Sequence, residues 1–67
     1  MGGGMIKKND ILTGKVQSFG SDGEGVVQAE GCVFFVPYAL PGEEIEFKAL
    51  KIKGNTGYGK QIGRAHV

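Results

Sequence analysis

The sequence predicts an all-β fold, a small barrel of five short antiparallel strands. Three observations lead to this prediction. The chain has 67 residues, of which 13 are glycine, and that glycine fraction is far above the usual ~7%. The apolar residues come in short runs that end in turn signals. Nowhere do they recur at the three- and four-residue spacing of an amphipathic helix, so we expect one small, helix-poor domain.

The first two predicted strands form a hairpin. The run Ile11–Phe19 ends in an Asp-Gly turn within residues 20–23. Asp-Gly between apolar runs is a strong hairpin signal, because a type I′ turn needs positive φ at both central residues. The second strand, Gly25–Ala29, stops at another tight turn, formed by Glu30 and Gly31.

The third strand, Cys32–Val36, is apolar throughout, which predicts burial on both of its faces. Pro37 ends this strand, because proline has no backbone N–H to donate to the ladder. Residues 38–42 then form a loop that closes with a Pro-Gly turn of type II.

The fourth strand, 44–53, carries the most informative pattern. Apolar residues alternate with charged ones as far as Ala49 and then shift by one position, to Leu50 and Ile52. A shift of one residue turns all later side chains to the other face of the sheet. We therefore predict a β-bulge near Ala49 and Leu50 that keeps Leu50 and Ile52 inward, since bulges bend strands around small barrels.

A turn at residues 54–57 leads into the fifth strand, 58–62. Five short, glycine-rich strands with a bulge fit an OB-like barrel best, with an SH3-like barrel as the alternative. We expect the core to consist of the valines, the isoleucines and the four phenylalanines, which are Phe19, Phe34, Phe35 and Phe47.

Charge is nearly balanced overall but segregated along the chain. The formal net charge is +1, which excludes a strongly cationic, histone-like binder. Residues 1–15 carry +2, residues 16–46 hold six acids and no Lys or Arg, and residues 47–67 hold five bases and no acid. Such segregation can form one basic face for a polyanion. Taken alone, however, the charge pattern favours a dipolar surface without a partner.

No catalytic constellation is evident, so this fragment is not expected to be an enzyme. Catalysis needs a nucleophile, a base and a group that stabilises charge. The single histidine, His66, lies in the tail, and the adjacent Glu43 and Glu44 would point to opposite faces of a strand. The glycines of residues 20–25 are accompanied by acids and are followed by no helix, which indicates a hairpin rather than a phosphate loop.

The single cysteine, Cys32, can form neither an internal disulfide nor a multi-thiolate metal site. At the start of an apolar strand it is expected to be a small buried residue, and a reducing cytoplasm is its simplest location. No apolar run approaches the ~20 residues of a membrane helix. Residues 1–4 resemble a cloning leader and residues 63–67 an added tail or a truncation point, which leaves residues 5–62 as the domain.

Two strings are more specific than the composition. They are SDGEGVV at residues 21–27 and VFFVPYALPGEE at residues 33–44. Together they resemble the TRAM domain, in the version found at the N-terminus of RNA uridine-5-methyltransferases of the ribosomal-RNA type. The resemblance covers about residues 7–62 and has two departures. Tyr38 stands where the family usually has glycine, and the chain ends before the family's cluster-binding cysteines, cofactor-binding domain and catalytic cysteine, none of which Cys32 matches.

This resemblance implies a five-stranded barrel that binds ribosomal or transfer RNA and delivers it to an attached uracil-5-methyltransferase domain. That catalytic domain is absent from the chain and would be a further partner of the barrel. It would bind S-adenosylmethionine, and an iron–sulfur cluster where the parent protein has one. The fragment itself is expected to hold no cofactor and no metal.

For the RNA surface we predict four lysines and one aromatic residue. A tyrosine can stack on a base while neighbouring cations contact phosphates. The alternation of each strand places these side chains on the outside of the barrel. They are Lys15, Lys51, Lys53, Tyr58 and Lys60.

Two other functions fit the sequence. One is a structural or protein-interaction barrel that packs on its catalytic domain and barely touches RNA, which the acidic middle segment favours. The other is a free-standing small RNA chaperone, which the size of the domain allows. A native reading frame that stops near residue 62 would favour the chaperone.

Overall fold

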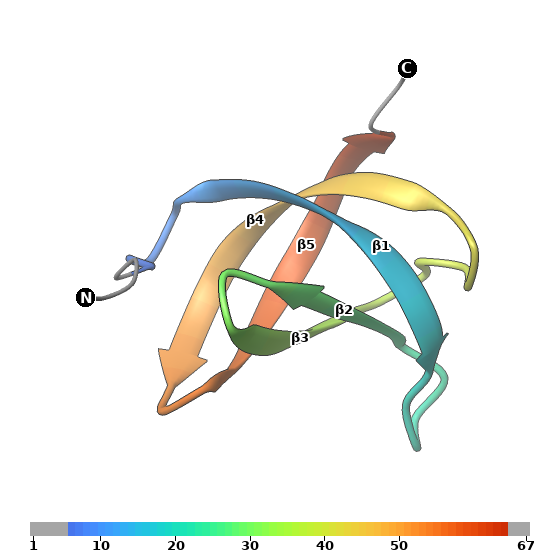
Figure 1. Cartoon of the computed structure of the whole chain (residues 1–67), viewed down its shortest axis with the longest axis horizontal. Coiled ribbons are helices and arrows are strands. Elements are labelled where there is room, and N and C mark those ends of the chain that lie inside the picture. Colours follow the sequence, from blue (N-terminus) through green and yellow to red (C-terminus); the bar gives the residue numbers. More distant parts are fainter. Residues whose placement is uncertain (1–5, 65–67) are drawn as a thin grey trace.

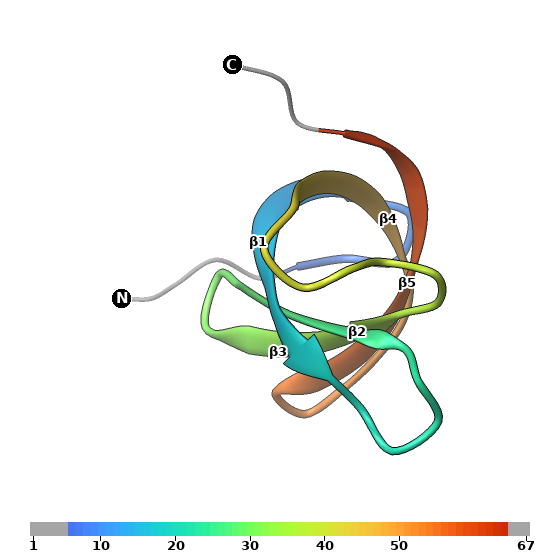
Figure 2. The same ribbon diagram turned by 90° about the vertical axis from the view of Figure 1, so that its right-hand side faces the viewer.

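The computed structural model describes residues 6–64, which form five strands and no helix (Figure 1). The strands close into a barrel in the order β1-β2-β3-β5-β4, and β4 pairs back with β1. Figure 2 shows the strands curving around a common centre. The prediction of an all-β, five-stranded, OB-like barrel is confirmed. The strands are β1 (Ile11–Phe19), β2 (Gly25–Ala29), β3 (Cys32–Val36), β4 (Glu44–Lys53) and β5 (Thr56–Arg64).

One pairing differs from the purely antiparallel arrangement that the sequence suggested. β3 and β5 run parallel, whereas the other four neighbouring pairs are antiparallel. Closure itself requires this, because strand directions cannot alternate all the way around a ring with an odd number of members. In the sequence, β4 lies between β3 and β5, so the chain passes through β4 on the other side of β5 before β5 pairs with β3.

The two hairpin turns of the first half differ in kind. At the end of β2, Glu30 and Gly31 both have positive φ, 53° and 79°, as a two-residue type I′ turn requires. The connection from β1 to β2 is longer: the Gly20 N–H donates to the Glu24 carbonyl at 2.7 Å. The predicted hairpin is therefore confirmed, but its Asp-Gly pair is part of a wider loop.

The ends of the described region bear on two expectations. β5 extends through Gly63 and Arg64, which the sequence assigned to the tail. The leader at residues 1–4 and His66 lie outside the described residues. Within residues 6–64 there is no helix of a length and apolarity that would cross a membrane.

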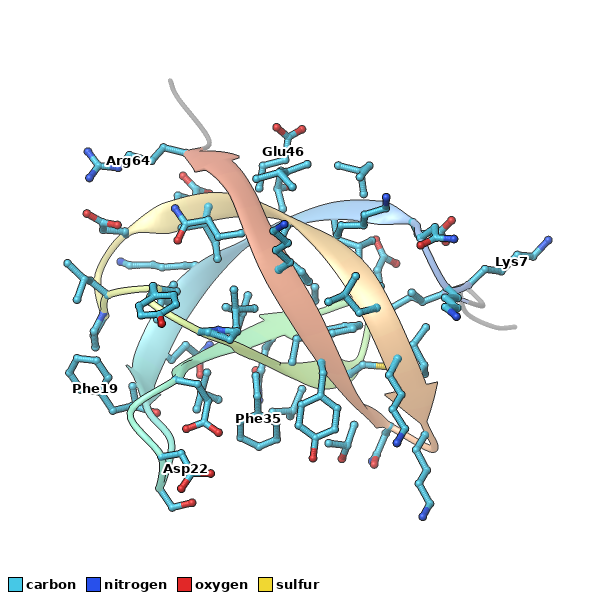
Figure 3. The ribbon with its side chains drawn as sticks, turned by 180° about the vertical axis from the view of Figure 1, so that it is seen from behind. Lys7, Phe19, Asp22, Phe35, Glu46 and Arg64 are labelled. Atoms are coloured by element: carbon cyan, nitrogen blue, oxygen red, sulfur yellow. The ribbon has the colours of Figure 1, made fainter. Side chains whose placement is uncertain are left out.

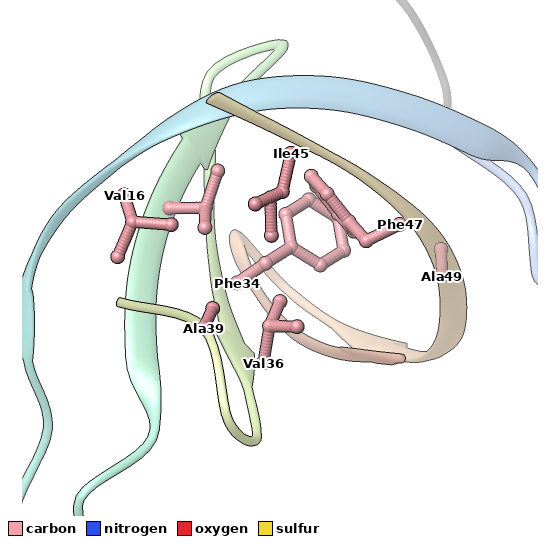
Figure 4. Close-up of a cluster of buried hydrophobic side chains, with 8 residues drawn as sticks. Val16, Phe34, Val36, Ala39, Ile45, Phe47 and Ala49 are labelled. Atoms are coloured by element: carbon pink, nitrogen blue, oxygen red, sulfur yellow. The ribbon is translucent and has the colours of Figure 1, made fainter. Parts of the chain in front are cut away.

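The barrel interior is filled by apolar side chains from four of the strands and the loop after β3 (Figure 4). At its centre the rings of Phe34 and Phe47 lie 5.1 Å apart, so the prediction that both belong to the core is confirmed. The fully buried residues are Val16, Val27, Phe34, Val36, Ala39, Ile45, Phe47 and Ala49.

Two glycines of β5 let these rings lie directly on the backbone. A Cβ added at Gly57 would lie 2.6 Å from the Phe34 ring, and one added at Gly59 would lie 2.8 Å from the Phe47 ring. Both distances are far inside van der Waals contact. The centre of β5 therefore contributes backbone, and no side chain, to the core.

Two of the four phenylalanines were placed wrongly by the sequence. Phe35 follows the inward Phe34, and successive strand residues point to opposite faces, so Phe35 is half-buried on the outside of the barrel (Figure 3). Phe19 is 56% exposed. It lies beyond a register shift between Val16 and Ser18, past the last buried position of β1.

The predicted bulge in β4 is confirmed, because the pairing with β5 shifts register between Ala49 and Lys51. Leu50, however, does not point inward as predicted. It is the extra, unpaired residue of the bulge and is 41% exposed. Ile52 returns to the inner face, where it is half-buried against the core.

Candidate nucleic-acid interface

Three strands bring two aromatic rings and a lysine into one row on the outside of the barrel. Phe35 of β3 is the register partner of Tyr58 of β5, and Tyr58 is the partner of Lys51 of β4. Directly paired residues share one face of a sheet. The rings of Phe35 and Tyr58 lie 5.8 Å apart at 36°, and Tyr58 remains 50% exposed. We call this pair of rings the aromatic platform.

Three more lysines surround the platform. Lys53 lies two pairs along from Lys51, opposite Thr56, and Lys60 lies two pairs along from Tyr58 in the other direction. The partner of Lys60 is Lys48, which the sequence did not single out. Lys48 alternates with the inward Phe47 and Ala49, and this signal could have identified it. The structure thus gathers Lys48, Lys51, Lys53, Tyr58 and Lys60 on one face.

Within residues 6–64, the lysines of this face are not neutralised by an acid. The ion pair found in that range joins Arg64 to Glu43 at 3.6 Å and involves none of these lysines. Lys48 and Lys60 face each other directly across two strands, and like charges in that position are destabilising. An anion bound between them would remove that repulsion.

Lys15 occupies a different place. It is exposed on β1, as its alternation with the buried Val16 requires. Its register partner is Glu44, at the opposite end of β4 from Lys53. Opposite charges across a strand pair stabilise a sheet, but among residues 6–64 no ion pair joins these two side chains, so Glu44 is the partner of Lys15 in register only. Lys15 lies apart from the other predicted residues.

Beyond Lys60, a groove of about 700 Å³ runs beside β5. We call it the β5 groove. Its apolar walls come from the loop after β3 and from two residues of the β4–β5 ladder, Leu50 and Ile62. Its charged lining residues are Lys60 and Arg64, and none of the acids that the structure describes lines it. Tyr38, which is 93% exposed, stands at its edge.

On its other side, Tyr38 borders a second groove, of about 580 Å³, which we call the β1–β2 groove. Phe19 and Leu40 form its apolar walls, and its charged lining residues are Asp22 and Glu24. Figure 3 shows Phe19 and Asp22 together at one end of the molecule, away from Arg64. Pro37 and Tyr38 line both grooves.

Residues with possible catalytic chemistry are not brought together in the described part of the chain. Cys32 is half-buried at the start of β3 and packs against the core, as a small apolar residue would. Over residues 6–64, no group of three His, Cys, Asp or Glu side chains could hold a metal ion. The lysines, aromatic rings and grooves described above make up the candidate binding surface.

Sequence comparison relates the chain to RNA methyltransferases of streptococci. It is 45% identical over 56 residues to an "Uncharacterized RNA methyltransferase" of Streptococcus mutans serotype c, and 43% identical over 56 residues to one of Streptococcus agalactiae serotype V. Each match covers 84% of this chain but 12% of the relative, so the chain spans about an eighth of the relatives' length. No family model matches the chain. The chain is thus homologous to one segment of RNA methyltransferases.

The fold has a solved counterpart. The solution structure of a conserved protein from Methanococcus maripaludis matches with a TM-score of 0.76 at 23% sequence identity. The match covers 85% of this chain and 81% of that one. It supports the barrel architecture and carries no functional assignment.

Proposed function

We propose that this barrel is the RNA-binding module of an RNA methyltransferase and delivers RNA, ribosomal RNA first of all, to a uracil-5-methyltransferase domain of the same polypeptide. The observation that carries the proposal is the row formed by Phe35, Tyr58 and Lys51 across three strands. An aromatic platform flanked by lysines is the surface that single-stranded nucleic acid needs. The homology to RNA methyltransferases supports RNA as the ligand.

The module works by binding and positioning. An unpaired base stacks on the exposed face of Tyr58, while Lys51, Lys53 and the Lys48–Lys60 pair contact the phosphates on either side. The bases of double-stranded RNA could not stack on the platform, because their faces are already covered by neighbouring bases. The barrel thus holds a single-stranded or looped segment, in the manner of a TRAM domain, and leaves the methyl transfer to another part of the protein.

We assign S-adenosylmethionine and any iron–sulfur cluster to the catalytic part of the longer protein. The chain has one cysteine, Cys32, and an iron–sulfur cluster is usually held by four thiolates. The barrel's residues therefore do not fit a cluster. The barrel contributes RNA affinity and orientation only.

The test is a titration of the isolated domain with single-stranded RNA over a range of salt concentrations. About 0.7 counterion is released per contacted phosphate, so three or four lysine contacts give a log–log slope of roughly −2 to −3. The double variant Lys51→Ala/Lys53→Ala should flatten the slope. Tyr58→Ala should weaken binding and leave the slope nearly unchanged.

Lys7 and Lys8 provide the matched control, since they are exposed lysines that precede the first strand. If Lys7→Ala/Lys8→Ala reduces binding as much as the Lys51/Lys53 double variant, the attraction is diffuse and the site is wrong. A wild-type domain that binds no RNA at millimolar concentration and low salt would overturn the proposal.

A second candidate function rests on the β1–β2 groove. Phe19 and Leu40 are both more than half exposed there, beside Asp22 and Glu24. A contiguous apolar surface of this kind suits contact with another protein surface, and its acids repel RNA. This favours a barrel that packs on its own catalytic domain. The two functions use different faces, so one barrel can serve both.

A further inference from the structure

We propose that the β5 groove is a second nucleotide subsite, in which Tyr38, Leu50 and Ile62 hold a nucleobase and Lys60 contacts the adjoining phosphate. The inference rests on the proposed RNA function and extends the binding surface beyond the aromatic platform. It assigns a ligand-contact role to Tyr38, Leu50 and Ile62, which neither the sequence pattern nor the relatives' names single out. Three independent observations support it.

The first observation is the backbone conformation and the exposure of Tyr38. Its φ is +68°, in the left-handed region that is unfavourable for residues other than glycine. Its ring is 93% exposed. A large aromatic ring that is held in solvent by strained backbone contributes little to the fold, and backbone strain of this kind is concentrated at ligand sites.

The second is the origin of the groove's apolar walls. Leu50 is the residue left unpaired by the register shift between Ala49 and Lys51. Ile62 is left unpaired by the other shift of the same ladder, where Glu46 pairs with Gly63 and Phe47 pairs with Gln61. Bulges re-aim side chains and are frequent beside functional sites. Here both bulges turn an apolar side chain into one groove.

The third observation is the sign of the charged residues that line the two grooves. Among the described residues, the charged groups that line the β5 groove are the bases Lys60 and Arg64, whereas those of the β1–β2 groove are the acids Asp22 and Glu24. Arg64 pairs with Glu43 at 3.6 Å, but its side chain is 72% exposed, and such surface pairs are weak. A ligand with an apolar ring and an anionic group therefore fits the β5 groove and is repelled by its neighbour.

The groove and the aromatic platform form one track. Lys60 lies between Tyr58 and Ile62 along the outer side of β5, so a phosphate at Lys60 can join a base on the platform to a base in the groove. The track ends near Gly63, where the Glu46 carboxylate lies 3.8 Å from the ideal Cβ position. We expect a short occupant, near the lower limit of about 4 nucleotides for OB-type barrels.

The test compares single-stranded oligouridylates of two, four and eight nucleotides in fluorescence-anisotropy titrations at low salt. Tyr38→Gly removes the ring and keeps the backbone conformation. This variant should lower the affinity for each of the three oligomers about 5- to 20-fold and leave the salt slope unchanged. Tyr58→Ala should weaken all three. Phe19→Ala, which removes another exposed ring from the β1–β2 groove, should change none.

The outcomes separate this inference from the proposed function. If Tyr58→Ala weakens binding but Tyr38→Gly leaves the affinity for all three oligomers unchanged, the second subsite is wrong and the proposed function stands, with the β5 groove left as a protein contact. If Phe19→Ala has the same effect as Tyr38→Gly, the effect is not specific to the groove and the inference fails. If wild-type protein binds none of the three oligomers, both fail. Thermal unfolding of each variant confirms that it is folded.

Discussion

Two grooves lie on either side of Tyr38 and share Pro37 as well, yet they suit different ligands. Both have apolar walls of similar extent, formed by Leu50 and Ile62 in one and by Phe19 and Leu40 in the other. Their charged residues are opposite in sign. On so small a barrel, apolar surface alone does not distinguish the two grooves, and the sign of their charged residues is the feature that would select between ligands.

The largest effect on the stability of the barrel, on which both grooves depend, is expected from overpacking its interior. Gly57→Ala places a Cβ 2.6 Å from the Phe34 ring and 2.9 Å from the Lys51 carbonyl oxygen, and the backbone carbonyl cannot move away without breaking the ladder. Overpacking of a core costs about 1–3 kcal/mol. We expect a loss in the free energy of unfolding at the upper end of that range, measured by urea denaturation.

Gly63→Ala is the matched control in the same strand. There the nearest atom to an added Cβ is the Glu46 Oε1, at an ordinary 3.8 Å. The free energy of unfolding should stay within about 0.5 kcal/mol of wild type. Equal destabilisation by the two alanines would show that the close contact of the Phe34 ring with the backbone at Gly57 is not what excludes a side chain there.

Exchanging the charges of the two grooves sharpens the comparison directly. Lys60→Glu should lower RNA affinity about tenfold or more and reduce the magnitude of the salt slope by at least about 0.7, because one phosphate contact is lost. Asp22→Lys should act in the opposite direction, raising affinity and steepening the slope by up to about 0.7. Both quantities come from the same titrations. If Asp22→Lys leaves both unchanged, the β1–β2 groove lies too far from bound RNA to matter.

Tyr38→Gly is expected to have a smaller effect on stability, and of the opposite sign to most substitutions. Removing a side chain from the left-handed region relieves about 1–2 kcal/mol of steric cost, and the added freedom of the unfolded chain offsets roughly 0.5–1 kcal/mol of that gain. The free energy of unfolding should therefore rise by about 0.5–1 kcal/mol in urea denaturation. A decrease would mean that the ring stabilises the fold, which would remove one argument for its role in binding.

The smallest effect is expected for Arg64→Ala. The Arg64–Glu43 pair is exposed and 3.6 Å long, so its removal should change the free energy of unfolding by less than about 0.5 kcal/mol. A change above about 1 kcal/mol, the upper limit for exposed pairs, would show that this end of β5 is held by the ion pair, and that Arg64 is not free to meet a phosphate.

Local sequence patterns predicted much of the barrel. The alternation in β4 located the bulge at Ala49 and Leu50, and the outward positions of Lys51, Lys53, Tyr58 and Lys60 follow from the alternation of β4 and β5. The orientation of Leu50 could not be predicted, because a phase shift in the sequence does not reveal which residue the bulge leaves unpaired. Phe35 was wrongly predicted to lie in the core, because a continuously apolar run has no alternation of polar and apolar residues that would distinguish its two faces.

The composition of the candidate site depends on pairing between distant strands. Phe35 meets Tyr58 only because the closed barrel sets β5 beside β3, as a parallel pair. Lys48 faces Lys60, and Lys15 faces Glu44, through register across β4. These neighbours are fixed by how the whole barrel closes, and no window of the sequence contains that information.

The glycines at the centre of β5 have a consequence for changing the ligand. Because Gly57 and Gly59 present only backbone to the core, the outward residues that follow them, Tyr58 and Lys60, can be replaced without altering the volume of the barrel interior. In most strands a new outward residue must remain compatible with inward neighbours that also pack. A library randomised at positions 58 and 60 should therefore retain a high proportion of folded members, which makes this strand a practical starting point for selecting barrels that recognise other polyanions.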